Sequence, residues 1–188
     1  MDHSISSFLN NAGSFSVEQQ QLLKEALQFK TLKKGEMLLK EGTICTSLSF
    51  VLSGAFFQYK VDQDGNKNAI DLNVCNDWIL NHKSFTTQKP SAYNIQAYQE
   101  STICFLTIDA MHLLIAKSQA FLQMGKILET AISRIDFFDN NNTPDEKYQY
   151  ILENKPEIAQ RFPLKLIASY LKITPETLSR VRNRLSKS

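Results

Sequence analysis

Near the carboxyl end of the chain, a glutamate and an arginine lie four residues apart and have the chemistry to read DNA bases. Glu176 and Arg180 fall on one side of a predicted helix over residues 174–186, and Leu178, Val181 and Leu185 fall on the other. An arginine donates two hydrogen bonds to guanine O6 and N7, and a glutamate accepts one from cytosine N4. The spacing therefore predicts a recognition helix whose exposed side enters the major groove.

The residues before this helix predict a second, shorter helix and a tight turn, which together make a helix-turn-helix. Pro163 begins a segment with apolar residues at helical spacing, from Leu164 to Leu171. Thr174 is a suitable N-cap, and Pro175 suits the first helical position. Polar side chains around the turn are placed to contact DNA phosphates, which position a protein without specifying a sequence. These expected backbone contacts are Lys165, Ser169, Thr174, Thr177 and Arg184.

The charge of the chain is unevenly distributed. Its net charge is +2, but residues 161–188 carry seven basic residues and one acid, so the preceding 160 residues have a net charge of −4. A basic tail on an acidic body is typical of a protein with one module that faces a polyanion. An ordinary helical hairpin with a solvated basic surface would have the same charge, and this alternative stays open.

A polar, asparagine-rich segment separates this tail from the rest of the chain. It ends in Thr143 and Pro144, which suit the N-cap and the first position of a helix, and Asp145 and Glu146 follow at the positive end of the helix dipole. We place the domain boundary near residue 140. The expected domains are an effector-type domain at 1–120, a dimerisation helix at 121–139 and a helix-turn-helix domain at 140–188.

Residues 121–138 have apolar side chains at alternating intervals of three and four residues. Such a heptad stripe predicts a long helix with one seam available to pair with a second copy of the chain. A helix that packs only within its own chain is the alternative. The expected dimer seam comprises Phe121, Met124, Leu128, Ala131, Ile135 and Phe138.

Short β-prone segments separated by glycine turns fill residues 31–107 and predict an antiparallel roll. Asp64 and Gly65 indicate a hairpin between two of these strands. A loop or short helix is expected over residues 76–93. Before the roll, Ser16 and Gln19 form a plausible capping box for a helix with apolar positions as far as Phe29. The predicted class is α+β: a β-roll with flanking helices, a dimerisation helix and an all-α helix-turn-helix domain.

Residues 167–180 read IASYLKITPETLSR. Before them in the chain come the glycine turns near residues 35, 42, 54 and 65, in the order expected for a cyclic-nucleotide-binding roll. On these motifs the sequence resembles the Crp/Fnr family of bacterial transcription regulators, including its Glu-Thr-x-x-Arg recognition core. It is most similar to the short members common in Bacteroidetes-type bacteria. The resemblance implies a double-stranded β-helix of the cyclic-nucleotide-binding type and a homodimer that reads a two-fold-related site on double-stranded DNA. RNA polymerase is a candidate further partner.

The sequence departs from cyclic AMP-binding members of this family in the phosphate-binding segment. Leu80 and Asn81 stand where those members have Gly-Glu, and Ser91 and Ala92 stand where they have Arg-Ser. Because a cyclic phosphate then lacks its guanidinium partner, we expect no cyclic AMP binding in the usual mode and assign no cofactor. A pocket for another ligand, or a vestigial loop surface, is expected at Asn81, His82, Lys83, Ser91, Ala92 and Tyr93.

A second departure lies in the helix turn. Lys172 stands where many such motifs have glycine, and a residue with a side chain in a left-handed turn costs about 1 kcal/mol. We also expect any β-hairpin wing after the recognition helix to be short or absent. Neither departure removes the motif.

Other chemistries find little support in the sequence. It has no phosphate-binding glycine loop and no HExxH motif, and its three cysteines lack metal-ligand spacing. No apolar run reaches the roughly 18–20 residues of a membrane span, and no signal peptide is apparent. We therefore expect a cytoplasmic non-enzyme with no membrane partner. Two other functions were weighed: a ligand-binding sensory module whose tail binds protein, and a cupin-type enzyme, which would need a histidine and carboxylate cluster that the sequence does not offer.

Overall fold

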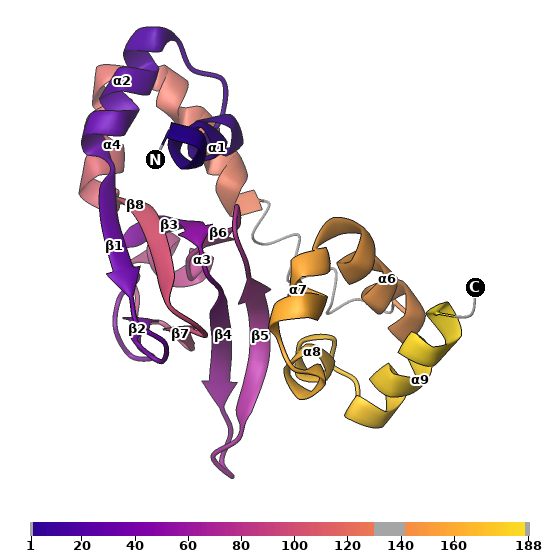
Figure 1. Ribbon diagram of the computed structural model, residues 1–188. Coiled ribbons are helices and arrows are strands. Elements are labelled where there is room, and N and C mark those ends of the chain that lie inside the picture. Colours follow the sequence, from indigo (N-terminus) through magenta and orange to yellow (C-terminus); the bar gives the residue numbers. More distant parts are fainter. Residues whose placement is uncertain (1, 130–141, 187–188) are drawn as a thin grey trace.

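In the computed structural model, which describes residues 2–129 and 142–186, a β-roll capped by helices lies beside a lobe of four helices (Figure 1). The helices before and after the strands are α1 (Asp2–Ala12), α2 (Val17–Ala26), α4 (Ile108–Lys117) and the 3-10 helix η1 (Gln119–Met124). The helical lobe comprises α6 (Pro144–Asn154), α7 (Pro156–Arg161), α8 (Leu164–Tyr170) and α9 (Pro175–Leu185). The predicted α+β class is confirmed.

The roll consists of two four-stranded antiparallel sheets. One has the strand order β1-β8-β3-β6, and the other has the order β2-β7-β4-β5. The strands are β1 (Gln28–Leu32), β2 (Met37–Leu39), β3 (Ser47–Ser53), β4 (Phe56–Val61), β5 (Lys67–Asn73), β6 (Trp78–Ile79), β7 (Asn94–Ala97) and β8 (Ser101–Thr107). A short helix, α3 (His82–Thr87), lies between β6 and β7, where the sequence predicted an inserted loop or helix.

Two glycine turns explain how the chain reverses around β4. Gly54 has a φ of 94°, and a Cβ there would lie 2.6 Å from the Cα of Ser101, so only glycine fits between β3 and β4. At the other end of β4, Gly65 has a φ of 82° in the hairpin to β5. The side chain of Asp62 accepts hydrogen bonds from the backbone N–H groups of Asp64 and Asn66, at 3.0 and 2.8 Å. The predicted hairpin is confirmed.

Helix α2, which precedes the strands, begins where the sequence predicts but ends earlier. The capping box of Ser16 and Gln19 is present at the start of α2. The helix ends at Ala26, because Leu27 is extended and Phe29 already belongs to β1, paired with Cys104 of β8. The apolar residue at position 29 therefore continues the helical spacing without belonging to the helix.

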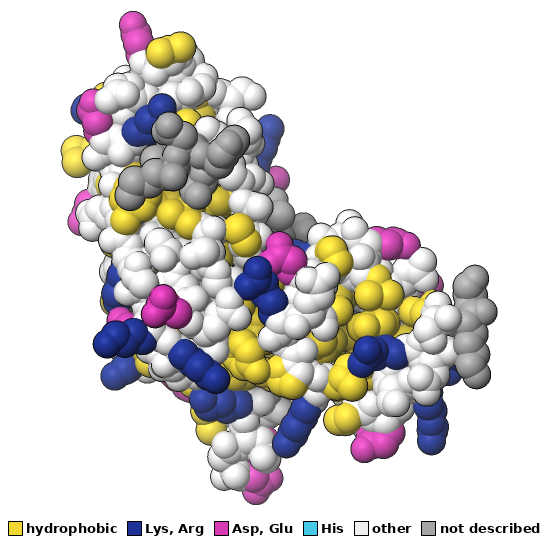
Figure 2. Space-filling model, in the orientation of Figure 1, with side chains coloured by type: hydrophobic (Ala, Val, Ile, Leu, Met, Phe, Trp, Pro, Cys, Tyr) yellow, Lys and Arg dark blue, Asp and Glu magenta, His cyan; other side chains and the backbone are white. Residues whose placement is uncertain are grey.

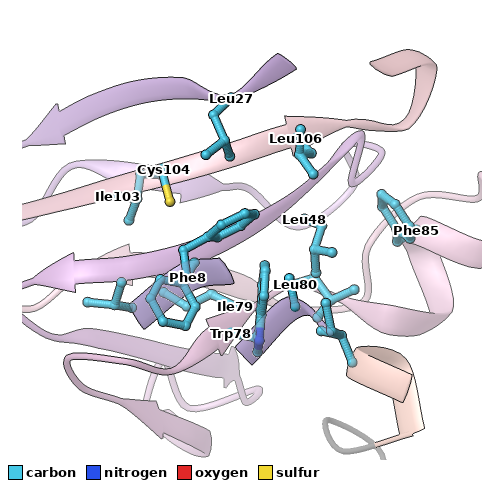
Figure 3. Close-up of a cluster of buried hydrophobic side chains, with 14 of the residues drawn as sticks. Phe8, Leu27, Leu48, Trp78, Ile79, Leu80, Phe85, Ile103, Cys104 and Leu106 are labelled. Atoms are coloured by element: carbon cyan, nitrogen blue, oxygen red, sulfur yellow. The ribbon is translucent and has the colours of Figure 1, made fainter. Parts of the chain in front are cut away.

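A cluster of aromatic side chains packs in the interior of the roll (Figure 3). Phe8 of α1, Phe50 of β3 and Trp78 of β6 meet with ring centroids 4.9–5.8 Å apart. Aromatic pairs at this separation add about 0.5–1.5 kcal/mol each beyond the burial of their area. The first helix thus belongs to the core of the roll.

The predicted dimer seam is wrong in its first positions. Phe121 and Met124 are 1% exposed and belong to the core of the roll, where Phe121 stacks on Phe15 at 5.3 Å. Leu128 is half-buried against the same core. Apolar residues at intervals of three and four identify an apolar face of a helix, but they do not show whether the same chain or a second copy covers that face. At residues 121, 124 and 128 the same chain covers it. The remaining seam residues, Ala131, Ile135 and Phe138, lie outside the described residues.

The roll and the helical lobe share a second hydrophobic core. Adjacent residues of β4 divide between the two cores: Phe56 points into the roll, and Phe57 packs in the cluster that contains the lobe. Leu72 of β5 joins Phe57 in that cluster, with Ile158 and Tyr170 from the lobe. Figure 2 shows hydrophobic side chains continuing from the roll onto the lobe. The β4–β5 strands therefore contribute side chains to both cores, and the lobe packs on their outer face.

Candidate nucleic-acid interface

The turn between α8 and α9 has the hydrogen bonds of a Schellman motif. Lys172 has a φ of 57°, its N–H donates to the carbonyl of Ser169 at 3.1 Å, and the N–H of Ile173 donates to the carbonyl of Ala168 at 3.0 Å. The residue that the sequence predicted to be strained is therefore the left-handed residue of the turn. This conformation ends α8 and directs the chain into α9.

Helix α9 begins and packs as predicted. The side chain of Thr174 accepts a hydrogen bond from the N–H of Thr177 at 3.2 Å, and Pro175 is the first helical residue. Leu178 and Val181 are fully buried against the other helices of the lobe. The helix is therefore held by one side and leaves the opposite side free to meet a partner.

The predicted base-reading residues lie on that exposed side. Glu176 and Arg180 are exposed, as are Arg182 and Asn183 further along the helix. A shallow depression along one flank of α9 is lined by Ser179, Arg182, Asn183 and Ser186. A glutamate and an arginine one helical turn apart, with further donors beside them, can face successive base edges in a major groove.

Of the predicted phosphate contacts, Lys165 on α8 and Thr174 are exposed, and Thr177 is half-buried. The hydroxyl oxygens of Thr174 and Thr177 lie 3.0 Å apart at the start of α9. Hydroxyls at a helix N-terminus can also donate to a phosphate. These three assignments remain predictions.

Ser169 has a different role from the predicted one. Its hydroxyl accepts a hydrogen bond from the backbone N–H of Ala69 in β5 at 3.0 Å, and the residue is half-buried. Helix α8 packs against β5 with this side, so Ser169 joins the lobe to the roll. Its assignment as a phosphate contact is corrected for this reason.

Arg184 is also engaged within the protein. Its guanidinium donates to both carboxylate oxygens of Asp145 in α6, at 2.7 and 2.8 Å. This bidentate pair joins α9 to α6, and its geometry is the strongest that arginine makes with a carboxylate. We therefore reassign Arg184 from a DNA-backbone contact to a residue that pairs α9 with α6.

The helix before these elements also begins as the sequence predicted. Thr143 and Glu146 form a capping box at the start of α6, and Pro144 is the first helical residue. Tyr148 and Ile151 are buried, but Leu152 is 41% exposed. Helix α7, which the sequence analysis missed, is only six residues long and begins at Pro156.

The lobe is also joined to the roll by polar and aromatic contacts. The Nζ of Lys155 lies 2.6 Å from the Oδ1 of Asp77, with the two side chains 14% and 13% exposed. The ring of Phe162 lies 4.7 Å from that of Tyr98. No local pattern in the sequence predicts these pairs, because each joins residues more than 60 positions apart.

Most of the expected effector residues line a cleft of about 700 Å³ between the roll and the lobe. Asn81, His82, Lys83, Ala92 and Tyr93 are on its walls. Ser91 is not among the lining residues. It is buried, and its hydroxyl accepts from the side-chain amide of Asn81 at 2.7 Å, so it supports the wall from behind. The sequence analysis missed the opposite wall, formed by Tyr170 and Lys172.

The cysteines have environments that disfavour thiolate chemistry. Burial raises the pKa of Cys104 to about 12 and also raises the pKa of Cys45. Burial, followed by the charge of Glu157, raises the pKa of Cys75. Among the described residues, no group of three or more histidine, cysteine, aspartate or glutamate side chains could hold a metal ion. No helix in the described parts of the chain is long and apolar enough to cross a membrane.

Known proteins are similar to this chain in sequence and in fold. The cyclic nucleotide-binding domain family matches residues 29–118. Over 174 residues the chain is 25% identical to the fumarate and nitrate reduction regulatory protein of Yersinia pestis, an alignment that covers 85% of this chain and 69% of that protein. FixK2 from Bradyrhizobium japonicum, a solved structure, is 16% identical with a TM-score of 0.71 and covers 86% of this chain and 85% of its own.

A solved structure from Eubacterium rectale that is assigned to the Crp/Fnr family is 17% identical with a TM-score of 0.58, covering 92% of this chain and 84% of its own. The fold and the site define a class of proteins in which a cyclic-nucleotide-binding β-roll is joined to a helix-turn-helix. Residues 29–118 form a cyclic nucleotide-binding domain, and the chain is similar in sequence and fold to transcription regulators of the Crp/Fnr type.

Proposed function

We propose that this protein regulates transcription by binding double-stranded DNA through α9. The observation that carries the proposal is the exposed side of α9, where Glu176 and Arg180 project one turn apart from a capped and firmly packed helix. Arg180 would donate to guanine O6 and N7, and Glu176 would accept from cytosine N4. Lys165, Thr174 and Thr177 would contact phosphates. The named relative is a regulator, and we propose no catalytic activity.

The experiment is a gel shift with the promoter region of the protein's own gene at two salt concentrations. We expect Arg180→Ala to remove specific binding, because a bidentate base contact is worth about 1–3 kcal/mol of discrimination. We expect Lys165→Ala to weaken binding to all sequences alike and to reduce the salt slope by about one. Lys117→Ala is the control, because Lys117 is exposed at the end of α4 in the roll, and this variant should bind DNA as the unchanged protein does.

Unchanged affinity and salt slope in Arg180→Ala would show that α9 is not the recognition helix. A complete lack of salt-dependent binding would favour the second function weighed above, a ligand-binding sensory module whose tail binds another protein.

We also propose that the active form is a homodimer on a two-fold-related operator, as the family resemblance implies, with a cytoplasmic location. Phe121 and Met124 are buried within the chain, so we propose that the other predicted seam residues, Leu128, Ala131, Ile135 and Phe138, make the contact between the two copies. Sedimentation equilibrium of the full chain tests the dimer, and a mass equal to one chain at micromolar concentration, where a stable dimer would persist, contradicts it. RNA polymerase remains a candidate partner.

We propose further that cyclic AMP does not bind in the usual mode. Asn81 stands in the phosphate-binding segment, but its carbonyl oxygen accepts from the N–H of Ser84 at 3.0 Å and its amide donates to Ser91. Ala92 has no group that could pair with a phosphate. Calorimetric titration with cyclic AMP is expected to show no binding at micromolar concentration, and Ser91→Arg is the variant that places a guanidinium at the arginine position of those members.

A further inference from the structure

The exposed side of α9 presents a third polar side chain in line with the two proposed base readers. At about 100° per residue, Asn183 projects about 20° from Glu176 and about 60° from Arg180. Leu178, which is fully buried, projects about 160° from Glu176 on the same scale. Asn183 is exposed and therefore lies near the middle of the side that faces away from the lobe.

The side-chain amide of Asn183 is available to a partner. Within the described parts of the chain it makes no hydrogen bond, and only the backbone carbonyl of this residue accepts one, from the hydroxyl of Ser186 at 3.3 Å. The next residue, Arg184, is by contrast paired with Asp145. Asparagine is less favourable than alanine inside a helix, and no side-chain hydrogen bond to the described residues offsets this difference. The packing of α9 therefore gives no reason for an asparagine at this position.

The surface beside Asn183 is open. The depression along this flank of α9 is lined by Ser179, Arg182, Asn183 and Ser186, and the two serines have short side chains. Helix α9 packs on α6 and α8 and lies on the side of the lobe away from the roll (Figure 1). A base edge can therefore approach the amide of Asn183 directly.

The spacing along α9 also suits the rise of double-stranded DNA. Residues 176, 179, 180 and 183 are at positions i, i+3, i+4 and i+7, the spacing at which a homeodomain recognition helix contacts bases. From Glu176 to Asn183 the helix advances about 10 Å. This distance corresponds to about three base-pair steps of roughly 3.4 Å. Asn183 can therefore contact a base pair beyond those that Glu176 and Arg180 contact.

The chemistry of an asparagine amide selects one base in the major groove. Its NH₂ group donates to adenine N7 and its carbonyl oxygen accepts from adenine N6, and no other base presents that pair of groups. We propose that Asn183 is a specificity-determining residue that reads adenine, so that the site bound by α9 contains an A·T pair about three base pairs from the pair read by Glu176. This inference rests on the proposed DNA binding through α9 and names the sequence that α9 selects.

The test is selection of binding sites by the full chain from a random double-stranded DNA library, followed by sequencing. We expect one position of the enriched motif to prefer adenine by about 5- to 150-fold, the range that one bidentate base contact supplies. Asn183→Ala should lose this preference and keep the preferences that depend on Arg180. Asn11→Ala is the matched control, because Asn11 is an exposed asparagine in α1, and it should enrich the unchanged motif.

A second substitution separates base reading from a structural role. Asn183→Asp keeps the shape of the side chain but replaces the amide donor with an acceptor. We expect the preferred base at that single position to change from adenine to cytosine, whose N4 donates. The added negative charge should also weaken binding to all sequences alike. A residue that only supported α9 would not change the preferred base, and circular dichroism checks that each variant is folded.

The outcomes distinguish this inference from the proposed function. If Asn183→Ala keeps the adenine preference while Arg180→Ala loses the motif, this inference falls and the proposed function stands. A uniform loss of affinity in Asn183→Ala, with the same preferred bases, also overturns the inference and assigns the residue to the DNA backbone. If the unchanged protein enriches no motif, the proposed function fails and the inference falls with it.

Discussion

At the scale of single residues, the helix turn has a lysine in a conformation that glycine adopts more easily. Lys172 has a φ of 57°, where a Cβ is crowded by the backbone. We expect Lys172→Gly to raise the free energy of unfolding by about 0.5–1 kcal/mol, because relief of the left-handed strain exceeds the extra chain entropy of glycine. Urea unfolding followed by circular dichroism measures this change.

Gln88 is a matched control for this substitution, since it has a φ of 52° at the end of α3. Gln88→Gly should stabilise by a similar amount, reduced by loss of the hydrogen bond from its side chain to the carbonyl of Phe85. Destabilisation by Lys172→Gly would mean that the lysine side chain itself holds the turn.

At the scale of elements, the start of α6 makes stability depend on pH. The backbone and side-chain hydrogen bonds with Thr143 lower the pKa of Glu146 below its ordinary value of 4.5. Since the folded pKa is the lower one, the contribution to stability is present above pH 4.5 and is lost as pH falls through the folded pKa. We expect Glu146→Gln to flatten this acid dependence, because glutamine keeps the capping geometry without titrating. Unfolding midpoints at pH 3–7 measure the effect, and an unaltered profile in Glu146→Gln would contradict it.

The ion pair between Asp145 and Arg184 joins the first and last helices of the lobe. We expect Asp145→Asn to lower the free energy of unfolding by less than about 1 kcal/mol, and the loss to shrink in high salt, because the pair is partly exposed. The same variant releases Arg184 on α9, so we expect non-specific DNA affinity to rise slightly if α9 binds DNA as proposed. Unfolding and gel shifts at low and high salt measure both effects, and Glu153→Gln on the same helix is the control. A salt-independent loss would indicate a packing defect.

The elements show what could be predicted from the sequence. Caps at Ser16, Thr143 and Thr174 were predictable because each depends on residues three positions apart. The roles of Ser169 and Phe121 were not, because both depend on partners that the fold brings from distant positions. The exposed side of α9 was predicted from helical spacing. The lobe wall of the cleft was missed because nothing local relates Tyr170 to residues 81–93.

At the scale of the whole molecule, the ion pair of Lys155 and Asp77 anchors the helical lobe to the roll. We expect Lys155→Gln to lower the free energy of unfolding by about 1–3 kcal/mol, because it leaves a largely buried carboxylate without its cation. Denaturant unfolding measures this change. Arg161→Gln removes a more exposed pair with Glu157 within α7 and should cost less than about 0.5 kcal/mol. Equal costs for the two variants would show that burial at the junction contributes nothing.

The shared core has a consequence for how the molecule unfolds. Leu72, Phe57 and Tyr170 belong to one cluster across the junction, so we expect the roll and the lobe to unfold together. The single tryptophan, Trp78, reports on the roll by fluorescence, and amide exchange in α9 reports on the lobe. Leu72→Ala should destabilise both reports equally, by about 2–5 kcal/mol. Leu106→Ala, in the other core, tests the converse. If this variant destabilises the surroundings of Trp78 and leaves amide exchange in α9 unchanged, the roll and the lobe unfold independently and the expectation is wrong.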